Sequence, residues 1–157
     1  LAGGDALLFL HADTRLPEGF EERVRQALAR PGTAAGAFRL RIAGPGRGLR
    51  LVEGAANWRA RLLQMPYGDQ ALFVKREVFW EAGAFPPLPI MEDVEFVRRL
   101  KARGRIVLAP GRALTSARRW RRLGLLKTWL INQRVIAGYG LGVAPERLAA
   151  WYRLKKP

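Results

Sequence analysis

Short apolar segments alternate along this chain with longer segments of helical periodicity, and this alternation constrains the fold more than any other feature. Residues 6–10 read Ala-Leu-Leu-Phe-Leu, an uninterrupted apolar run typical of a strand covered on both faces in a parallel sheet. Residues 35–42 alternate between apolar and polar, the pattern of a strand with one buried face. Further strands are expected at residues 70–74 and 105–109. The pattern predicts an α/β fold.

Helical periodicity occupies the segments between these strands. It predicts helices at residues 17–30, 49–63, 75–82, 92–100 and 123–139, and a last helix from Pro145. In residues 49–63 the apolar positions spread around the helix, so we expect it to pack on both sides. We expect one domain over residues 1–157, in which residues 123–157 form a carboxy-terminal helical extension.

The composition excludes several classes of protein. The chain has no cysteine, so disulfides, thiolate metal sites and a cysteine nucleophile are all excluded. No uncharged apolar run reaches the roughly 18 residues that a spanning helix needs, and no charged and then apolar leader opens the chain. We therefore expect a cytoplasmic protein.

Positive charge is concentrated in the second half of the chain. The formal net charge is +15, and residues 97–145 contain twelve Lys or Arg residues and no Asp or Glu. Such a segment is expected to attract phosphates, whether of a nucleotide, an anionic lipid surface or a nucleic acid. The abundance of Arg, Ala, Gly and Pro also fits the codon bias of a high-GC genome, which would give the charge no function.

The first candidate site follows the first predicted strand. Asp13 and His11 lie at its carboxyl end, where open α/β sheets place their ligands. A carboxylate beside an imidazole can bind a divalent cation that neutralises a diphosphate leaving group. Alternatively, Asp13 only initiates a turn and caps the next helix.

The second candidate site is the pair Glu92 and Asp93, which opens a predicted helix after a loop stiffened by three prolines. A carboxylate there can act as the general base for an attacking hydroxyl. The positive end of the helix dipole also favours acidic residues in a first turn, without any function.

A third candidate site is a turn that feeds a predicted strand. Tyr67, Asp69 and Gln70 can hydrogen-bond a sugar or another polyol acceptor, although Gly-Asp is also ordinary turn chemistry.

An aromatic residue lies inside a basic run at Arg118, Arg119 and Trp120. Guanidinium groups bind phosphate oxygens and the indole can stack beside them, in a nucleotide site or on single-stranded nucleic acid. A solvated basic loop is the alternative.

The order of these motifs resembles a known family. The chain reads Leu-Leu-Phe-Leu-His-Ala-Asp-Thr at 7–14, Tyr-Gly-Asp-Gln-Ala at 67–71, Met-Glu-Asp-Val-Glu-Phe at 91–96 and Arg-Arg-Trp at 118–120. This combination closely resembles family 2 of the glycosyltransferases, and most of all a bacterial subgroup of small members whose first motif reads His-Ala-Asp-Thr. The match covers nearly the whole chain.

The resemblance implies a GT-A fold, with a Rossmann-like and mostly parallel sheet, and a metal-dependent inverting transfer from a nucleotide sugar to a hydroxyl acceptor. Asp13 stands where the family has the last carboxylate of its Asp-x-Asp motif, which ligates Mn²⁺ or Mg²⁺, and His11 stands where the first Asp is usual. Asp93 corresponds to the catalytic base, with Glu92 as its neighbour. Arg119 and Trp120 echo the phosphate-side Arg-Trp of processive members.

Family members also carry a strand-helix-strand unit for the nucleotide base ahead of the Asp-x-Asp motif, whereas this chain starts almost at that motif. The resemblance thus implies a fold lacking its first βαβ portion, impaired donor binding and a possible homodimer through the uncovered sheet edge.

A binding module without catalysis is the alternative function. Residues 123–139 are amphipathic and basic, so they can lie on an anionic membrane surface, although packing in the core or in a dimer explains the same pattern. Nucleic-acid binding through the basic segment would depend steeply on salt and need no metal.

Overall fold

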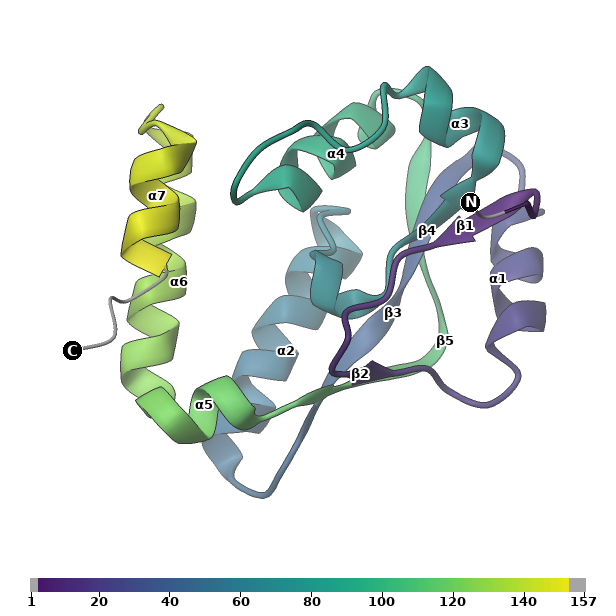
Figure 1. The fold of residues 1–157 in the computed structure, drawn as a ribbon. Coiled ribbons are helices and arrows are strands. Elements are labelled where there is room, and N and C mark those ends of the chain that lie inside the picture. Colours follow the sequence, from purple (N-terminus) through teal and green to yellow (C-terminus); the bar gives the residue numbers. More distant parts are fainter. Residues whose placement is uncertain (1–2, 153–157) are drawn as a thin grey trace.

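A five-stranded sheet with apolar side chains on both faces forms the centre of the fold (Figure 1). The structure is a computed structural model that describes residues 3–152. The strands are β1 (Ala6–Leu8), β2 (Thr14–Arg15), β3 (Thr33–Ala43), β4 (Phe73–Lys75) and β5 (Arg105–Ser116). Their order across the sheet is β1-β4-β3-β5-β2.

The sheet is mixed, so the expectation of a mostly parallel sheet is wrong. Only β3 and β5 run parallel, while the β1–β4, β4–β3 and β5–β2 pairs are antiparallel. The apolar run at residues 6–10 indicates that both faces of a strand are covered, but it does not indicate the direction of the neighbouring strand. The prediction of a parallel pairing from this run therefore failed. Leu7 packs into the core on one face of the sheet and Leu8 into the core on the other. The α/β class is confirmed, and a Rossmann-like GT-A topology is not evident.

Helices cover both faces of this sheet. They are α1 (Phe20–Leu28), α2 (Arg47–Leu62), α3 (Arg76–Glu81), α4 (Glu92–Lys101), α5 (Arg118–Leu123), α6 (Leu125–Gly140) and α7 (Pro145–Tyr152), with a 3₁₀ turn η1 (Gly68–Gln70). On one face, α3 and α4 bury Phe79, Phe96 and Leu100. On the other face, α1 packs Val24 and Leu28 against Phe38 and Phe73. No helix within residues 3–152 combines the length and apolarity needed to cross a membrane.

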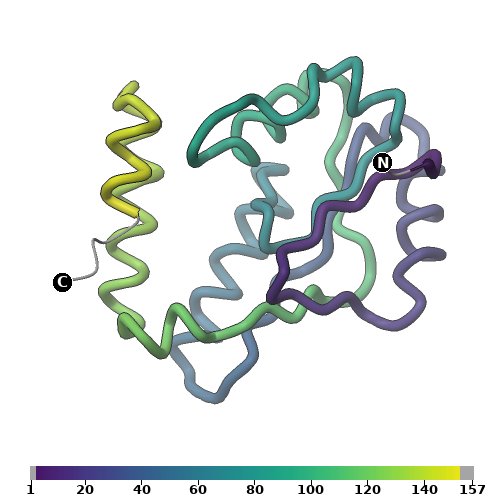
Figure 2. Tube along the Cα trace, in the orientation of Figure 1, coloured from purple at the N-terminus to yellow at the C-terminus, as the bar shows by residue number. Residues whose placement is uncertain are grey.

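The helices α6 and α7 form a hairpin that stands beside the sheet layers and is joined to the end of β5 through α5 (Figure 2). Gly138 allows the two helices to approach, because a Cβ there would lie 2.8 Å from both Leu148 and Trp151. Val135 and Leu148 of the hairpin pack against Met91 and Val94 at the start of α4. The hairpin thus closes one side of the region between α2 and α4.

The boundaries differ from expectation at several elements. The predicted strand at residues 70–74 is divided between η1 and β4, because Ala71 between them has a left-handed φ of 50°. The strand predicted at 105–109 continues to Ser116. The basic run, expected as a loop or a binding segment, forms the short helix α5.

Helix α2 does not pack on both sides as predicted. It buries Ala56 and Ala60, but Leu51, Trp58 and Leu62 are 75%, 60% and 57% exposed. The alternation predicted for residues 35–42 is confirmed only in the second half of β3, where Phe38, Leu40 and Ile42 are buried and the arginines between them are not, whereas residues 33–38 are all buried.

Side chains bond the backbone of the central strand β3 along the part of its edge that β4 does not reach. Strand β4 pairs with β3 only at Ala35 and Gly36. Beyond that point Asn57 of α2 bonds both the N–H and the C=O of Leu40, at 2.7 and 3.1 Å. An unpaired buried backbone group costs about 1–3 kcal/mol, so these amide contacts stabilise the strand edge.

The same edge is completed on either side of Asn57. Gln70 donates from Nε2 to the Phe38 carbonyl, and Oε1 of Glu53 accepts from the Ile42 N–H at 2.6 Å. The Arg50 guanidinium donates to the Ile42 carbonyl at 2.7 Å and also forms an ion pair with Glu53. A row of side chains from α2 and η1 therefore substitutes for a neighbouring strand, and we call these four residues (Arg50, Glu53, Asn57 and Gln70) the edge cap.

Replacing Asn57 with leucine is expected to lower the free energy of unfolding by about 2–4 kcal/mol, because two backbone groups of Leu40 lose their partner. Chemical denaturation measures the change. Arg61→Ala, at an exposed position of the same helix, serves as the control and is expected to shift stability by no more than about 0.5 kcal/mol. Equal effects of the two substitutions would contradict the edge-cap role.

Candidate functional site

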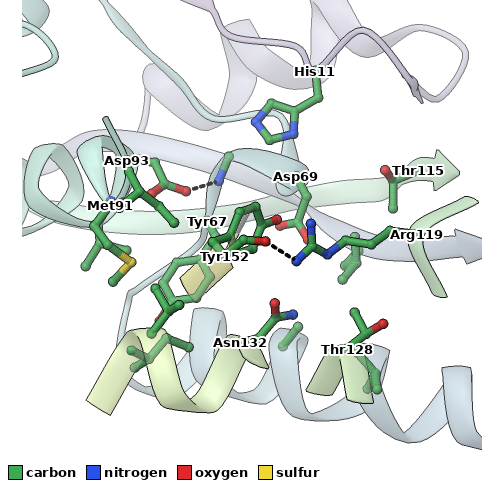
Figure 3. A pocket seen from close by; sticks show the side chains of 18 of the residues that line it. His11, Tyr67, Asp69, Met91, Asp93, Thr115, Arg119, Thr128, Asn132 and Tyr152 are labelled. Atoms are coloured by element: carbon green, nitrogen blue, oxygen red, sulfur yellow. Dashed lines mark hydrogen bonds between the residues drawn. The ribbon is translucent and has the colours of Figure 1, made fainter. Parts of the chain in front are cut away.

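A cavity of about 560 Å³ lies between α2, η1, the start of α4 and the α6–α7 hairpin (Figure 3). Its polar lining includes His11, Asp69, Asp93, Arg119 and Asn132, which come from separate parts of the chain. Apolar residues line it as well, among them Val52, Ala56, Trp129 and Ile136. An apolar cavity with a few convergent polar groups is the usual form of a small-molecule site.

Asp93 connects the start of α4 to η1. Its Oδ2 accepts a hydrogen bond from the backbone N–H of Gly68 at 2.7 Å, and its Oδ1 accepts from the N–H of Val94 at 2.8 Å (Figure 3). A carboxylate has about four lone-pair positions, so both oxygens can accept a further bond. Asp93 is thus held in place and still able to take a proton.

Gly68 permits the close approach of the histidine. A Cβ at this position would lie 2.6 Å from Nε2 of His11 and 3.4 Å from Oδ2 of Asp93. No side chain larger than hydrogen fits unless the imidazole moves. The glycine therefore brings the loop after β1 against the start of α4.

Asp69 lies in an unusual electrostatic position. Burial raises the pKa of its carboxyl group, and the negative charge of Asp93 raises it further, while the charges of Arg59 and His11 oppose the shift. Its Oδ1 is buried and has no hydrogen-bond partner among residues 3–152. An unsatisfied carboxyl oxygen on a cavity wall is suited to a hydroxyl group of a ligand.

Two arginines of the cavity lining lie over tyrosine rings. The Arg59 guanidinium is 3.5 Å from the centre of the Tyr67 ring, and that of Arg119 is 3.8 Å from the Tyr152 ring. Burial raises the pKa of the Tyr67 hydroxyl, which stays neutral at physiological pH. Arg119 also donates from Nη2 to the Tyr152 carbonyl at 3.1 Å, while its buried Nε has no partner. This donor is free to bind an anion.

Asp13 lies at the rim of the cavity with its side chain 41% exposed. Its Oδ2 is 4.0 Å from Nη2 of Arg118, a long ion pair. Within residues 3–152 no three His, Asp or Glu side chains come close enough together to hold a metal ion. One carboxylate and one imidazole suit a Mg²⁺ or Mn²⁺ ion whose other ligands are water and substrate phosphate, and not one held by the protein alone.

Backbone strain occurs on both acidic segments of the cavity. Ala71, next to η1, and Met91, directly before α4, have left-handed φ values of 50° and 66°. Such conformations cost about 1–3 kcal/mol each for residues with a side chain and are concentrated at functional sites. Met91 is also buried, so packing on its side chain holds this geometry.

The structure brings most of the sequence-predicted residues together. The cavity lining includes His11, Asp13, Tyr67, Asp69, Glu92, Asp93, Arg119 and Trp120. Two predicted residues do not line it. Gln70 is completely buried in the edge cap, where its amide bonds the backbone of β3, and the Arg118 side chain is 80% exposed on the outer surface.

Sequence reasoning missed several lining residues. Arg59 of α2 and Tyr152 of α7 join the site only through tertiary packing. Thr128 and Asn132 of α6 have a detectable signal, because two polar residues spaced by four face the same side of an otherwise apolar helix. Oδ1 of Asn132 is buried without a partner, so it too is available to a ligand.

Comparisons with protein-family models, with curated proteins and with solved structures gave no match.

Substituting Gly68 with alanine is expected to displace the His11 ring and to lower the free energy of unfolding by about 1–3 kcal/mol, since the added methyl group overlaps the imidazole. His11 is the only histidine, so its imidazole NMR signals are unambiguous in a chain without a tag. Gly54→Ala is the control, because a Cβ there meets nothing within 4 Å. Unchanged imidazole signals in Gly68→Ala would contradict the contact.

The raised pKa of Asp69 predicts a pH-dependent loss of stability. Below its ordinary value of 3.8 the carboxyl is protonated in both the folded and the unfolded chain. Between that value and the raised folded pKa only the unfolded chain ionises, so the stabilisation of the fold by the neutral, buried carboxyl is lost progressively as the pH rises over this interval. Asp69→Asn removes the effect, and the stability of the variant relative to the parent is expected to increase with pH.

Denaturation at a series of pH values from about 4 to 8 measures this difference. Asp5→Asn, at an exposed position, controls for the loss of one negative charge. A difference between parent and Asp69→Asn that is constant over this range would contradict the assignment.

Proposed function

We propose that the chain is the catalytic and acceptor-binding part of an inverting glycosyltransferase, which moves a sugar from a nucleotide donor to a hydroxyl acceptor. The observation that carries the proposal is the meeting of Asp13, Asp69, Asp93 and Arg119 around one cavity. Asp93 would supply the base, Asp69 a carboxyl group that binds a hydroxyl, and Arg119 a positive charge for the leaving phosphate. The order of the motifs in the sequence supports the same reaction.

The acceptor hydroxyl is bound at the part of the cavity lined by Asp69 and Asp93. The free Oδ1 of Asp69 and the amide of Asn132 hydrogen-bond the acceptor, and the neutral Tyr67 hydroxyl is a further polar group on this wall. Asp93, held by the N–H groups of Gly68 and Val94, accepts the proton of the attacking hydroxyl. Glu92 lies beside it and adds negative charge at the same end of α4.

Bond exchange is a single displacement in this proposal. The acceptor oxygen forms a bond to the anomeric carbon while the bond from that carbon to the diphosphate oxygen breaks, and the configuration inverts. The electron pair leaves with the nucleoside diphosphate, whose charge the Arg119 guanidinium offsets across the cavity. The Trp120 ring packs beside Leu40 and Ala56 and fixes this wall.

A divalent cation fits this arrangement as a partner of the substrate. Asp13, with His11 near the same rim, would hold Mg²⁺ or Mn²⁺, which would supply positive charge to the leaving diphosphate.

Nucleotide release tests the proposal. The chain and the longest reading frame that contains it are assayed with a panel of nucleoside diphosphate sugars, simple polyol acceptors and Mn²⁺ or Mg²⁺. Asp93→Asn keeps an oxygen for the Gly68 N–H but loses the base, so kcat is expected to fall by about 10²–10⁴-fold. Glu77→Gln, an exposed acidic residue on α3, is the control.

Two outcomes would overturn parts of this assignment. Full activity of Asp93→Asn rules out Asp93 as the base. Absence of nucleotide release with every donor, from both the chain and the longer protein, rules out the transferase. The anomeric configuration of the product, read by NMR, separates inversion from retention.

A further inference from the structure

An exposed leucine stripe runs along the outer side of α6. Leu126 and Leu130 of α6 and Leu141 directly after it are 68%, 51% and 84% exposed, and Gln133 and Ala137, both exposed, lie between them at helical spacing. Large apolar side chains in water usually occur singly, whereas a contiguous set marks an interaction surface. Figure 1 shows that α6 stands at the edge of the molecule, away from the sheet.

The stripe and the cavity lining lie on different sides of α6. Thr128, Asn132 and Val135 line the cavity, and Gly138 faces α7. Positions 126, 130 and 137 project from another side of the helix, and Trp129 and Gln133, which also line the cavity, lie between the two sides. A partner on the leucine stripe would therefore border the cavity beside Trp129 and Gln133 without covering Thr128 and Asn132.

Cations flank the stripe, and neither α5 nor α6 contributes a carboxylate to this face. A shallow groove on this side is lined by Leu126, Lys127, Leu130 and Arg134. Arg121 and Arg122 are exposed in the last turn of α5, directly before it. The whole segment from residue 97 to 145 has no Asp or Glu. The surface is thus apolar at its centre and positive at its border.

We propose that this outer face of α5 and α6 docks on an anionic phospholipid bilayer, with the leucines among the acyl chains and the cations at the head groups. Charge complementarity decides among the possible occupants. A second copy of the chain would bring like charges together, because α5 and α6 contain no Asp or Glu. Single-stranded nucleic acid favours several aromatic stacking surfaces, whereas the exposed large apolar side chains of α6 are three leucines and a single aromatic residue, Trp129.

Vesicle flotation tests the docking. The chain is mixed with vesicles of phosphatidylcholine alone or of phosphatidylcholine with phosphatidylglycerol, at low and at physiological salt. We expect flotation with the anionic vesicles and little with the neutral ones, since each basic residue near the surface strengthens binding severalfold. No flotation with anionic vesicles at low salt would overturn the proposal.

Paired variants locate the surface. Leu126→Ser with Leu130→Ser is expected to reduce partitioning roughly tenfold or more, because two inserted side chains are lost. Leu51→Ser with Leu62→Ser removes equally exposed leucines from α2 and is expected to leave partitioning unchanged. Equal partitioning of the two double variants, after circular dichroism has shown both to be folded, rules out the leucine stripe.

Charge reversal separates a local from a general electrostatic effect. Arg122→Glu with Lys127→Glu is expected to abolish flotation, whereas Arg30→Glu with Arg61→Glu changes the net charge equally at exposed positions elsewhere in the chain and should retain most of it. Equal losses would show attraction by net charge alone and overturn the docking face. Displacement from vesicles by single-stranded RNA, or vesicle-independent dimers lost in the leucine variant, would assign the face to that other partner.

Discussion

The hydrogen bonds between the edge cap and β3 are the interaction on which the rest of the structure depends. Strand β4 pairs with only the first part of β3, so the remaining backbone groups need other partners. Asn57 and Glu53 fix α2 against the sheet, and Gln70 fixes η1 to the same strand. Burying a carboxylate is costly, but Glu53 has Arg41 and Arg50 as ion-pair partners. The position of η1 in turn determines where Asp69 and Asp93 meet.

In the candidate site some side chains are held rigidly by hydrogen bonds and ring contacts, while other polar atoms lack hydrogen-bond partners among the described residues. Asp93 is held by two backbone N–H groups, and both guanidiniums of the cavity are supported by tyrosine rings. Left-handed residues beside each acidic segment add local strain that the surrounding packing maintains. Free polar atoms remain on Asp69, Arg119 and Asn132. Such a cavity is prepared for a polar ligand that bears both hydroxyl and anionic groups.

Helix α6 has three differently used sides. One side lines the cavity through Thr128 and Asn132, a second receives α7 at Gly138, and the third exposes the leucine stripe. Its mixed pattern explains why periodicity alone left core packing, dimer formation and membrane contact open for residues 123–139. Because the cavity, helix α7 and the exposed leucine stripe each occupy a different side of α6, its apolar residues do not form a single face.

The sequence by itself determined the α/β class, the approximate positions of most helices and the alternation in the second half of β3, because apolar periodicity is a local property. Most of the candidate site residues that it selected also line the cavity, since polar and charged side chains at element ends are local signals. Strand direction, the side-chain completion of β3 and the burial of Gln70 were decided only by tertiary structure. The same holds for the entry of Arg59 and Tyr152 into the site. Each depends on which distant segment satisfies a given backbone group or covers a given face, and no local pattern records that choice.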